Sequence, residues 1–283
     1  MRSDERCARL RMVRVRAWRI AFFADLIFGM ARKVDGKLRR VKTIHIFGRH
    51  LPESNTISFE FFVWAPVLLF SMVAHEYAHA EAAYRQGDST AYMLGRLTLN
   101  PLKHIDPFMT VILPLVLWFG SHGTYTFGGA KPVPVNPRNY RQYVRGDIIV
   151  SLAGIAVNLV LFLIFTALFA TVGTLAEAVP VLGPTLEILQ RMMYYGMWLN
   201  LVLAFFNLIP IPPLDGSHVF YHLLPPGAGM QYRQLQRFGF LPIMVVSFML
   251  PGVIQFFLWP AVKLMRLALA MVIPVALPNG LPS

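Results

Sequence analysis

The chain has 283 residues, of which 56% are hydrophobic and only 14% are charged. A soluble domain carries about 25% charged residues, so this composition excludes a disordered chain and argues against an ordinary cytosolic domain. The net charge of +12 is concentrated in residues 1–50, where 14 Lys/Arg minus 4 Asp/Glu gives +10. Residues 51–283 hold 12 and 10, a net of only +2. The excess charge therefore belongs to a basic N-terminal arm, residues 1–57, attached to an apolar body.

The composition of the arm favours a membrane surface over nucleic acid. Its arginines alternate with apolar residues such as Val13, Val15 and Trp18, which is typical of segments that lie on an anionic membrane face. We therefore expect a lipid bilayer as a partner and no nucleic acid. Cys7 is the only cysteine, which rules out an intrachain disulfide and a cysteine metal cluster.

Several segments are long and apolar enough to cross a bilayer, which takes about 20 residues. In chain order they are Phe61–Tyr84, Ile148–Val172, Met192–Ile211, Phe238–Pro260 with Pro242 and Pro251 inside it, and a weaker Leu264–Leu277. Phe108–Phe119 is too short to cross and reads as a re-entrant segment. The sequence predicts an all-α integral membrane protein, a polytopic helical bundle of about four to six transmembrane helices. Its membrane-embedded core would cover residues 58–217, and residues 218–283 would add C-terminal membrane segments.

Two connectors between the spans are rich in proline. The first connector, Ala91–Pro107, reads AYMLGRLTLNPLKHIDP, and the second connector, Phe127–Pro137, reads FGGAKPVPVNP. Proline disfavours helix, and the alternation at 97–99 predicts a short strand. Non-helical backbone near a membrane must be buried in protein or line a wet cavity, so both connectors are candidate walls of a site. The alternative is a plain surface loop.

The distribution of charge predicts which side of the membrane each connector occupies. Basic residues gather in 85–147, whereas 173–190 has none and contains Glu177 and Glu187. By the positive-inside rule, 85–147 is cytoplasmic and 173–190 lies outside. The helix that ends near Tyr84 would then enter the membrane from outside. The basic N-terminal arm would therefore have to reach the outside or cross the membrane through the short apolar segment at 20–31.

His75, Glu76 and His79 form an HExxH motif at the end of the first apolar segment. On a helix, residues i and i+4 share a face, so both imidazoles can bind one zinc ion, and Glu76 beside them can serve as general base. The alternative is a pair of core histidines beside a buried acid. Three ionisable groups after a long uncharged run are costly in a membrane unless they have a function.

A catalytic zinc usually has three protein ligands. Asp215 is the favoured third ligand because it follows the 192–211 segment at a proline-rich turn. If the spans alternate as predicted, Asp215 and His79 lie at a similar depth. His218, or His104 and Asp106 in the first connector, are the alternatives.

With these motifs the chain resembles the site-2 protease family of intramembrane zinc metalloproteases, the prokaryotic peptidase M50 type. The resemblance runs from about 61 to 217 and rests on several ordered motifs. They are HEYAHA with Gly87-Asp88 downstream, GRLTLNPLKHIDP, FGGAKPVPVNP, AGIAVN at 153–158 and NLIPIPPLDG at 207–216. The chain departs from the family pattern at Ile155, Gly129 and Phe108-Met109, which concerns substrate fit and helix geometry rather than the chemistry.

The resemblance implies one Zn²⁺ per chain held by His75, His79 and Asp215, with Glu76 as catalytic base. It also implies that Asn207 holds the substrate or the oxyanion and that Asn158 belongs to the substrate-binding residues. The expected reaction is hydrolysis of peptide bonds within or beside transmembrane helices of membrane proteins. We expect a prokaryotic cell membrane protein with its active site near the cytoplasmic side.

Two other classes of protein deserve comparison. A zinc-binding membrane scaffold or pseudoprotease would keep the metal without the activity, and the intact Glu76 argues against it. A transporter using intramembrane His and Asp would usually show repeats and paired broken helices, and the sequence shows neither.

Overall fold

The computed structural model describes residues 59–112, 115–116, 131–278 and 281. The chain divides into two compact units, Met1–Phe62 and Val63–Ser283. The first unit lies almost wholly outside the described residues, and so does the basic arm, residues 1–57. The domain boundaries at 57 and 217 stay a prediction, and residue 217 lies within a helix of the second unit.

Helix α3, Phe59–Gln86, contains the HExxH motif and confirms the first apolar segment as a helix. It continues through Pro66, whose missing N–H removes one internal hydrogen bond. Its apolar run is long enough to cross a membrane. His75 follows the uncharged run and precedes the helix end by 11 residues, or about 16 Å at 1.5 Å per residue, so the motif lies about three turns before the end of α3.

The connectors after α3 contain only short helical turns among the described residues. These are α4 (Thr90–Met93), η2 (Pro101–Lys103), η3 (Pro107–Ile112) and η4 (Pro137–Asn139). The predicted strand at 97–99 is wrong, because this stretch is bent and makes no ladder. The two connectors nevertheless meet, since the Lys131 N–H donates to the His104 carbonyl at 2.7 Å. Of the re-entrant prediction at 108–119, residues 113–114 and 117–119 lie outside the described residues.

Helices α6 (Tyr143–Ala178) and α7 (Gly183–Asn207) form a long antiparallel pair. The connector at 173–190 is therefore mostly helical, with only Val179 and η5 (Pro180–Leu182) between the two helices. At the other end the prediction is confirmed, since α7 ends at Asn207 and Pro210 follows soon after. With 36 residues, α6 spans about 54 Å, well beyond the 30 Å hydrocarbon core of a bilayer.

Short helices follow α7 and lead to a last long helix. They are α8 (Gly216–Leu223), α9 (Pro226–Arg233), η6 (Gln234–Phe238), α10 (Leu241–Met249), α11 (Pro251–Val272) and η7 (Ile273–Val275). The predicted division of the last apolar stretch at Pro260 is wrong, because α11 passes through this proline without a break. Buried Ile254, Leu258, Ala261 and Met265 recur every three or four residues along one face. Their packing outweighs the hydrogen bond that Pro260 removes.

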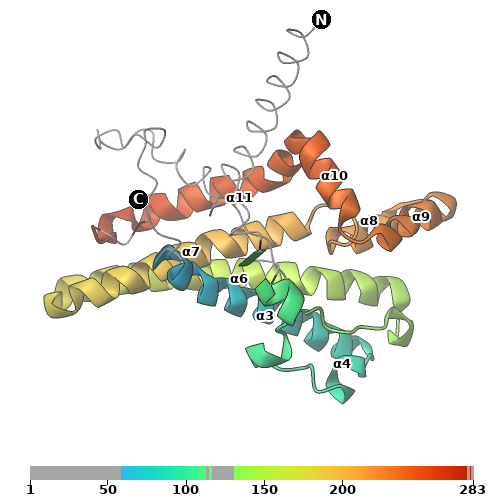
Figure 1. Ribbon diagram of the computed structural model, residues 1–283, viewed down its shortest axis with the longest axis horizontal. Helices are drawn as coiled ribbons and strands as arrows, with labels where there is room; N and C mark the ends of the chain where they lie inside the picture. Colours follow the sequence, from blue (N-terminus) through green and yellow to red (C-terminus); the bar gives the residue numbers. More distant parts are fainter. Residues whose placement is uncertain (1–58, 113–114, 117–130, 279–280, 282–283) are drawn as a thin grey trace, which may run out of the picture. The chain divides into compact units, whose positions relative to one another are not determined.

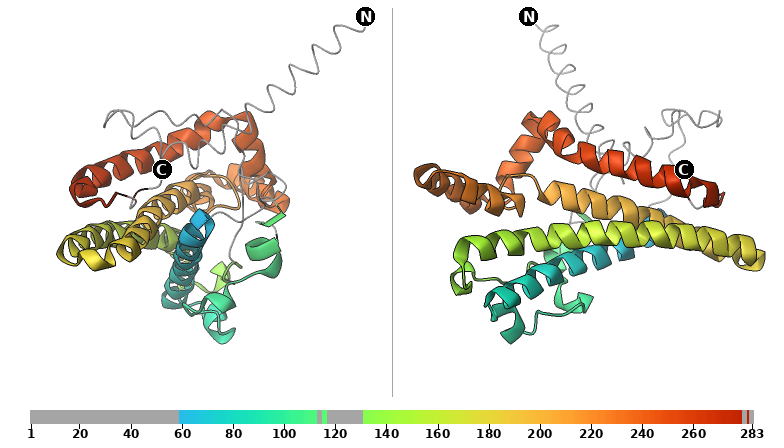
Figure 2. Two further views of the ribbon diagram at one scale, coloured as in Figure 1. Left: turned by 60° about the vertical axis from the view of Figure 1, so that its left-hand side comes forward. Right: turned by 180° about the vertical axis from the view of Figure 1, so that it is seen from behind.

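Within the second unit, α7 lies between α6 and α11 (Figures 1 and 2). Three of the described helices are long and apolar enough to cross a membrane, namely Phe61–Gln86, Tyr143–Ala178 and Pro251–Val275. This is fewer than the four to six that we predicted, and α7 is not among them because Gln190, Arg191 and Asn200 lower its mean hydropathy. The described residues contain helices and no strands, which confirms an all-α membrane protein.

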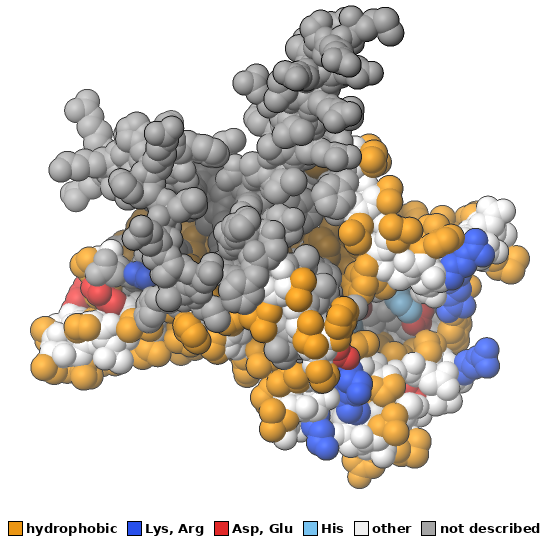
Figure 3. Space-filling model, viewed as in Figure 1, with side chains coloured by type: hydrophobic (Ala, Val, Ile, Leu, Met, Phe, Trp, Pro, Cys, Tyr) orange, Lys and Arg blue, Asp and Glu red, His pale blue; other side chains and the backbone are white. Residues whose placement is uncertain are grey.

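Figure 3 shows where charged and hydrophobic side chains gather on one face of the second unit. In Figure 3, basic side chains lie over α4 and over α8–α9, while hydrophobic side chains cover the exposed flank of α6. Acidic side chains appear at the opposite end of α6 in the same view, next to a basic side chain. The predicted sidedness of the connectors stays a prediction.

Candidate active site

The two histidines of the HExxH motif lie one helical turn apart on the buried face of α3. Their Nε2 atoms are 3.0 Å apart. The Nδ1 atom of His79 bonds to the backbone carbonyl of Val150 at 2.7 Å, and Nδ1 of His75 bonds to Oδ1 of Asn158. Because each ring is held by an acceptor at Nδ1, the Nε2 lone pairs of both rings face the same point.

Asp215 brings the third donor atom from a distant part of the chain. Its Oδ2 atom lies 3.1 Å from Nε2 of His75 and 3.3 Å from Nε2 of His79. The residue stands immediately before α8, where the turn after α7 folds back on itself. Gly216 makes this fold possible, because a Cβ there would lie 2.2 Å from the carbonyl oxygen of Leu208. The structure thus brings together the three residues that the sequence singled out, here called the metal group.

Three hydrogen-bond acceptors meet in the metal group. One candidate ligand atom from each of His75, His79 and Asp215 lies within 4.8 Å of the other two. The lone pairs repel one another unless a positive charge, a proton or a metal cation, lies between them. Ligands about 2.1 Å from a tetrahedral zinc are separated by roughly 3.4 Å, close to the separations of 3.0–3.3 Å found here. Two imidazoles and one carboxylate are also a donor set typical of catalytic zinc, so these residues fit that ion.

The charge of Asp215 suits the same role. Burial raises the pKa of its carboxyl group, but where protons on the Nε2 atoms stand in place of a cation, attraction to His79 and hydrogen bonds from both histidines outweigh burial. The pKa therefore lies well below the ordinary value of 3.8. An ionised carboxylate is the form that binds a metal.

Helix α6 approaches the metal group so closely that only glycine fits. A Cβ on Gly154 would lie 2.5 Å from Cε1 of His75 and 2.6 Å from Nε2 of both histidines. Sequence reasoning noted this glycine only as part of AGIAVN. A small residue four positions before Asn158 on the same helix face is the signal that could have revealed it.

Glu76 is half-buried and contacts the second connector. Its Oε2 atom accepts a hydrogen bond from the Val133 N–H at 2.8 Å. The guanidinium of Arg96 in turn donates to the carbonyl of Lys131 at 3.1 Å, which ties the two connectors together. The connectors therefore form one wall beside the HExxH helix, as the sequence predicted.

The alternative third ligands all lie elsewhere. His104 is fully buried and its Nε2 bonds to the carbonyl of Thr98 at 2.8 Å. Asp106 caps the following turn by accepting from the Phe108 N–H at 2.9 Å. His218 pairs with Asp147, with Nδ1 and Oδ1 3.3 Å apart. None of the three belongs to the metal group.

The two predicted asparagines have different surroundings. Asn158 is fully buried, and its amide contacts His75 on one side and Asn200 on the other. This geometry makes it a positioning partner of a histidine, and the substrate-binding role expected for it stays a prediction. Asn207 ends α7 and donates to the carbonyl of Leu203 at 2.9 Å, which uses one of its two amide hydrogens. Asn200 was missed, although a buried amide within an apolar stretch is itself a signal of function.

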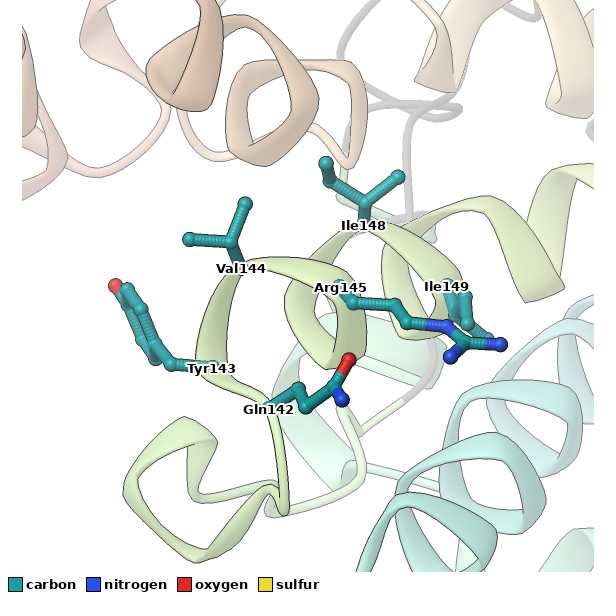
Figure 4. A pocket seen from close by; sticks show the side chains of 6 residues that line it. All are labelled: Gln142, Tyr143, Val144, Arg145, Ile148 and Ile149. Carbon is teal, nitrogen blue, oxygen red and sulfur yellow. The ribbon is translucent and has the colours of Figure 1, made fainter.

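A shallow apolar hollow lies along the first turns of α6 (Figure 4). Its lining residues are Gln142, Tyr143, Val144, Arg145, Ile148 and Ile149. Their side chains fan out from the helix, and none of them belongs to the metal group. This hollow carries no chemistry of its own.

The fold and the site together define a class. Two histidines one turn apart and an acid between them in sequence, set in an apolar helix with a distant aspartate, are typical of membrane-embedded metallopeptidases. A family model described as peptidase family M50 matches residues 177–250, the part that contains Asp215. Together with the relatives below, this match shows that the chain belongs to peptidase family M50.

Two relatives cover most of the chain. "Putative zinc metalloprotease YwhC" of Bacillus subtilis strain 168 is 40% identical over 195 residues, which is 68% of this chain and 82% of that protein. "Putative zinc metalloprotease Rip2" of Mycolicibacterium smegmatis is 34% identical over 190 residues, which is 67% of each chain. No solved structure matches the chain.

Proposed function

We propose that this protein is an intramembrane zinc endopeptidase. It would hydrolyse peptide bonds within or beside transmembrane helices of membrane proteins, with its active site near the cytoplasmic side of a prokaryotic cell membrane. The observation that carries the proposal is the convergence of three acceptor atoms from α3 and the turn before α8 within an apolar helix bundle. Family membership and the names of the relatives support zinc as the ion.

The metal ligands in this proposal are His75, His79 and Asp215. Asn158 and the Val150 carbonyl orient the two histidines, and the backbone turn before α8 positions Asp215. Zinc in such a site polarises a carbonyl group and lowers the pKa of a water molecule. The protein has to keep both Nδ1 atoms protonated so that Nε2 can bind, and the contacts with Asn158 and the Val150 carbonyl do this.

Glu76 is the proposed general base. Its carboxylate takes a proton from the water whose oxygen forms a bond with the scissile carbonyl carbon. It then delivers this proton to the amide nitrogen as the C–N bond breaks, which gives one carboxylate and one amine product. The hydrogen bond from the Val133 N–H fixes the carboxylate for both transfers. Asn207 keeps one amide hydrogen that can stabilise the oxyanion.

The connectors supply a place for an extended substrate. A helical substrate must unwind before attack, because its carbonyls are engaged in hydrogen bonds. Residues 131–136 carry no helix and lie beside Glu76, so an unwound segment can pair with their backbone. Proline at Val135 should then reduce cleavage and leave zinc bound, whereas Val135→Ala should cleave normally. Normal cleavage by Val135→Pro would remove this pairing from the proposal.

The central experiment compares wild type with Glu76→Gln in liposomes that contain a membrane-spanning reporter. We expect wild type to cleave the reporter and Glu76→Gln to bind the same amount of zinc without cleaving. If neither protein cleaves any of several membrane-spanning reporters while both bind zinc, the scaffold or pseudoprotease alternative is favoured. Ion flux that persists after zinc chelation would favour a transporter.

A further inference from the structure

We propose that Asn200 is a positioning residue that sets the tautomer of His75 through Asn158. This inference rests on the proposed function, since it takes His75 as a metal ligand. Three polar side chains from three helices form the connection, here called the amide relay: Ser71 on α3, Asn158 on α6 and Asn200 on α7. All three are fully buried. Buried polar groups inside apolar helices are costly and are usually functional.

The amide relay ends at the backbone carbonyl of Val67, and this carbonyl determines the direction of every hydrogen bond in it. The carbonyl of Val67 can only accept, so the Ser71 hydroxyl donates to it at 2.8 Å. The Ser71 oxygen then accepts from Nδ2 of Asn200 at 2.9 Å. The same Nδ2 donates to the carbonyl of Gly196 at 2.8 Å. Two acceptors therefore fix the Asn200 amide in one orientation.

The fixed amide of Asn200 determines the orientation of the next one. Its Oδ1 atom faces Asn158 and accepts from Nδ2 of that residue at 2.8 Å. Since Nδ2 of Asn158 is used in this way, Oδ1 of Asn158 faces His75. An amide oxygen can only accept, so Nδ1 of His75 must carry the hydrogen. The lone pair of Nε2 is then free for the metal.

The other histidine shows why the relay serves His75 alone. Nδ1 of His79 bonds directly to the backbone carbonyl of Val150 at 2.7 Å. A carbonyl oxygen can only accept a hydrogen bond, so Nδ1 of His79 carries the hydrogen without help from any further residue. The amide of Asn158 can turn by 180° and present its NH₂ group to His75. Only Asn200 prevents this rotation among the described contacts of Asn158.

Helix α7 also provides a matched control for a merely structural role. Gln190 is a second fully buried amide on this helix. Its Nε2 donates to the carbonyls of Phe169 and Val275, and its Oε1 accepts from the Leu277 N–H. Gln190 thus ties α6 and the C-terminal segment together without contact to the metal group. Removing either amide from α7 costs stability, but only Asn200 connects to a metal ligand.

The test uses the full chain purified in detergent with three variants, Asn200→Leu, Asn200→Asp and Gln190→Leu. The first measurement is the zinc dissociation constant by competition with a chelator. The second is the ¹⁵N NMR signal of His75 in the zinc-free protein, which reports which ring nitrogen carries the hydrogen. Loss of outer partners of metal ligands weakens binding by about 10- to 100-fold. Being one residue further out, Asn200→Leu should weaken it by about tenfold, at the lower end of that range.

Asn200→Asp and Gln190→Leu serve as the controls. Asn200→Asp keeps an oxygen that accepts from Asn158 but loses the hydrogens that Ser71 and Gly196 accept, so it should retain more affinity than Asn200→Leu and less than wild type. Gln190→Leu should bind zinc like wild type and keep the hydrogen on Nδ1 of His75. Equal zinc affinities for Asn200→Leu and Gln190→Leu, with Nδ1 of His75 still protonated in both, would overturn the relay.

A fourth variant separates this inference from the proposed function. His75→Ala should lose zinc if the ligand set is right. If His75→Ala binds zinc like wild type, the ligand set itself is wrong. If His75→Ala loses zinc and Asn200→Leu does not, the ligand set stands and the relay alone fails.

Discussion

The histidine half of the metal group and its carboxylate half are held in place by different parts of the chain. His75 and His79 share one helix, so their spacing is fixed by the helix geometry, and outer partners only orient the rings. Asp215 lies 140 residues after His75 and owes its position to a turn and to the packing of α8. The first half is therefore local, and the second depends on the whole fold.

The carboxylate half is anchored by hydrogen bonds at some distance from the metal group. Asp147 in α6 is almost fully buried, and its two oxygens contact His218 and His222 at 3.3 and 2.8 Å. Both histidines are on α8, which begins at the residue after Asp215. These two contacts thus hold α8 against α6 and, with it, the backbone that presents Asp215.

The largest expected effect comes from removing the ligands themselves. His75→Ala and Asp215→Ala should each lose zinc, since two remaining donors cannot complete a three-ligand site. His104→Ala and His218→Ala should retain it, because neither side chain belongs to the metal group. Zinc content of the purified variants is the measurement. Full zinc in Asp215→Ala together with loss in His104→Ala would show that the carboxylate half is assigned wrongly.

A smaller but still severe effect should follow from Gly154→Ala, which disturbs the histidine half. The added methyl would lie within 2.6 Å of Nε2 of both histidines, so α6 or the rings must move. We expect loss of zinc binding and of cleavage with a retained helical circular dichroism spectrum. Gly252→Ala is the matched control, since a methyl on this helical glycine meets nothing within 4 Å. Equal zinc affinity in the two variants would contradict the close approach of α6.

An intermediate effect should follow from Asp147→Leu, which releases the carboxylate half and leaves the histidine half intact. Imidazole N–H groups that lose their acceptor in a largely buried contact cost about 1–3 kcal/mol of stability. We expect faster zinc release and a lower melting temperature, because α8 loses its tie to α6. The exposed pair of Arg85 and Glu81 offers the control, and Glu81→Gln should cost at most about 1 kcal/mol. If zinc release were unchanged in Asp147→Leu, α8 would not need this tie to present Asp215.

The smallest effect on zinc should come from Asp88→Asn, which acts on the connector wall alone. The buried Asp88 carboxylate accepts from the Asn136 N–H at 2.6 Å and from Nδ2 of Asn139 at 2.8 Å, besides contacts with Thr90. An amide there must point its NH₂ at a donor, which costs about 1–3 kcal/mol. We expect unchanged zinc affinity and slower cleavage, as the segment that bonds Glu76 loosens. A parallel loss of zinc would mean that the connectors support the metal group directly.

The same carboxylate gives this wall a defined pH dependence. Burial raises the pKa of Asp88, but the hydrogen bonds from Asn136, Thr90 and Asn139 outweigh burial and hold it below 3.8. A lowered folded-state pKa means that the stabilisation is fully present above the unfolded value and is lost as the pH falls through the folded value. The wall should therefore be insensitive to pH near neutrality and weaken only in strong acid.

Much of the architecture was predictable because it depends on local patterns. The apolar run before His75 indicated a helix long enough to cross a membrane, and the prolines after Asn207 indicated where α7 ends. The division at Pro260 was wrong because burial along one face of α11 outweighs one missing hydrogen bond. That helices α6 and α7 extend through most of 173–190 was not predicted, because the absence of basic residues indicates sidedness and says nothing about helix ends.

The sequence by itself determined the HExxH pair, since residues four apart on a helix always share a face. It also restricted the third ligand to a few candidates, because acids are rare in so apolar a chain. Only the tertiary structure brings Asp215, and none of its rivals among the described residues, beside both histidines, and only it revealed Gly154, Asn200 and the contacts of Asp147 with α8. The physical reason is that these contacts join residues on different helices, and neither spacing nor hydropathy along one segment encodes how separate helices pack.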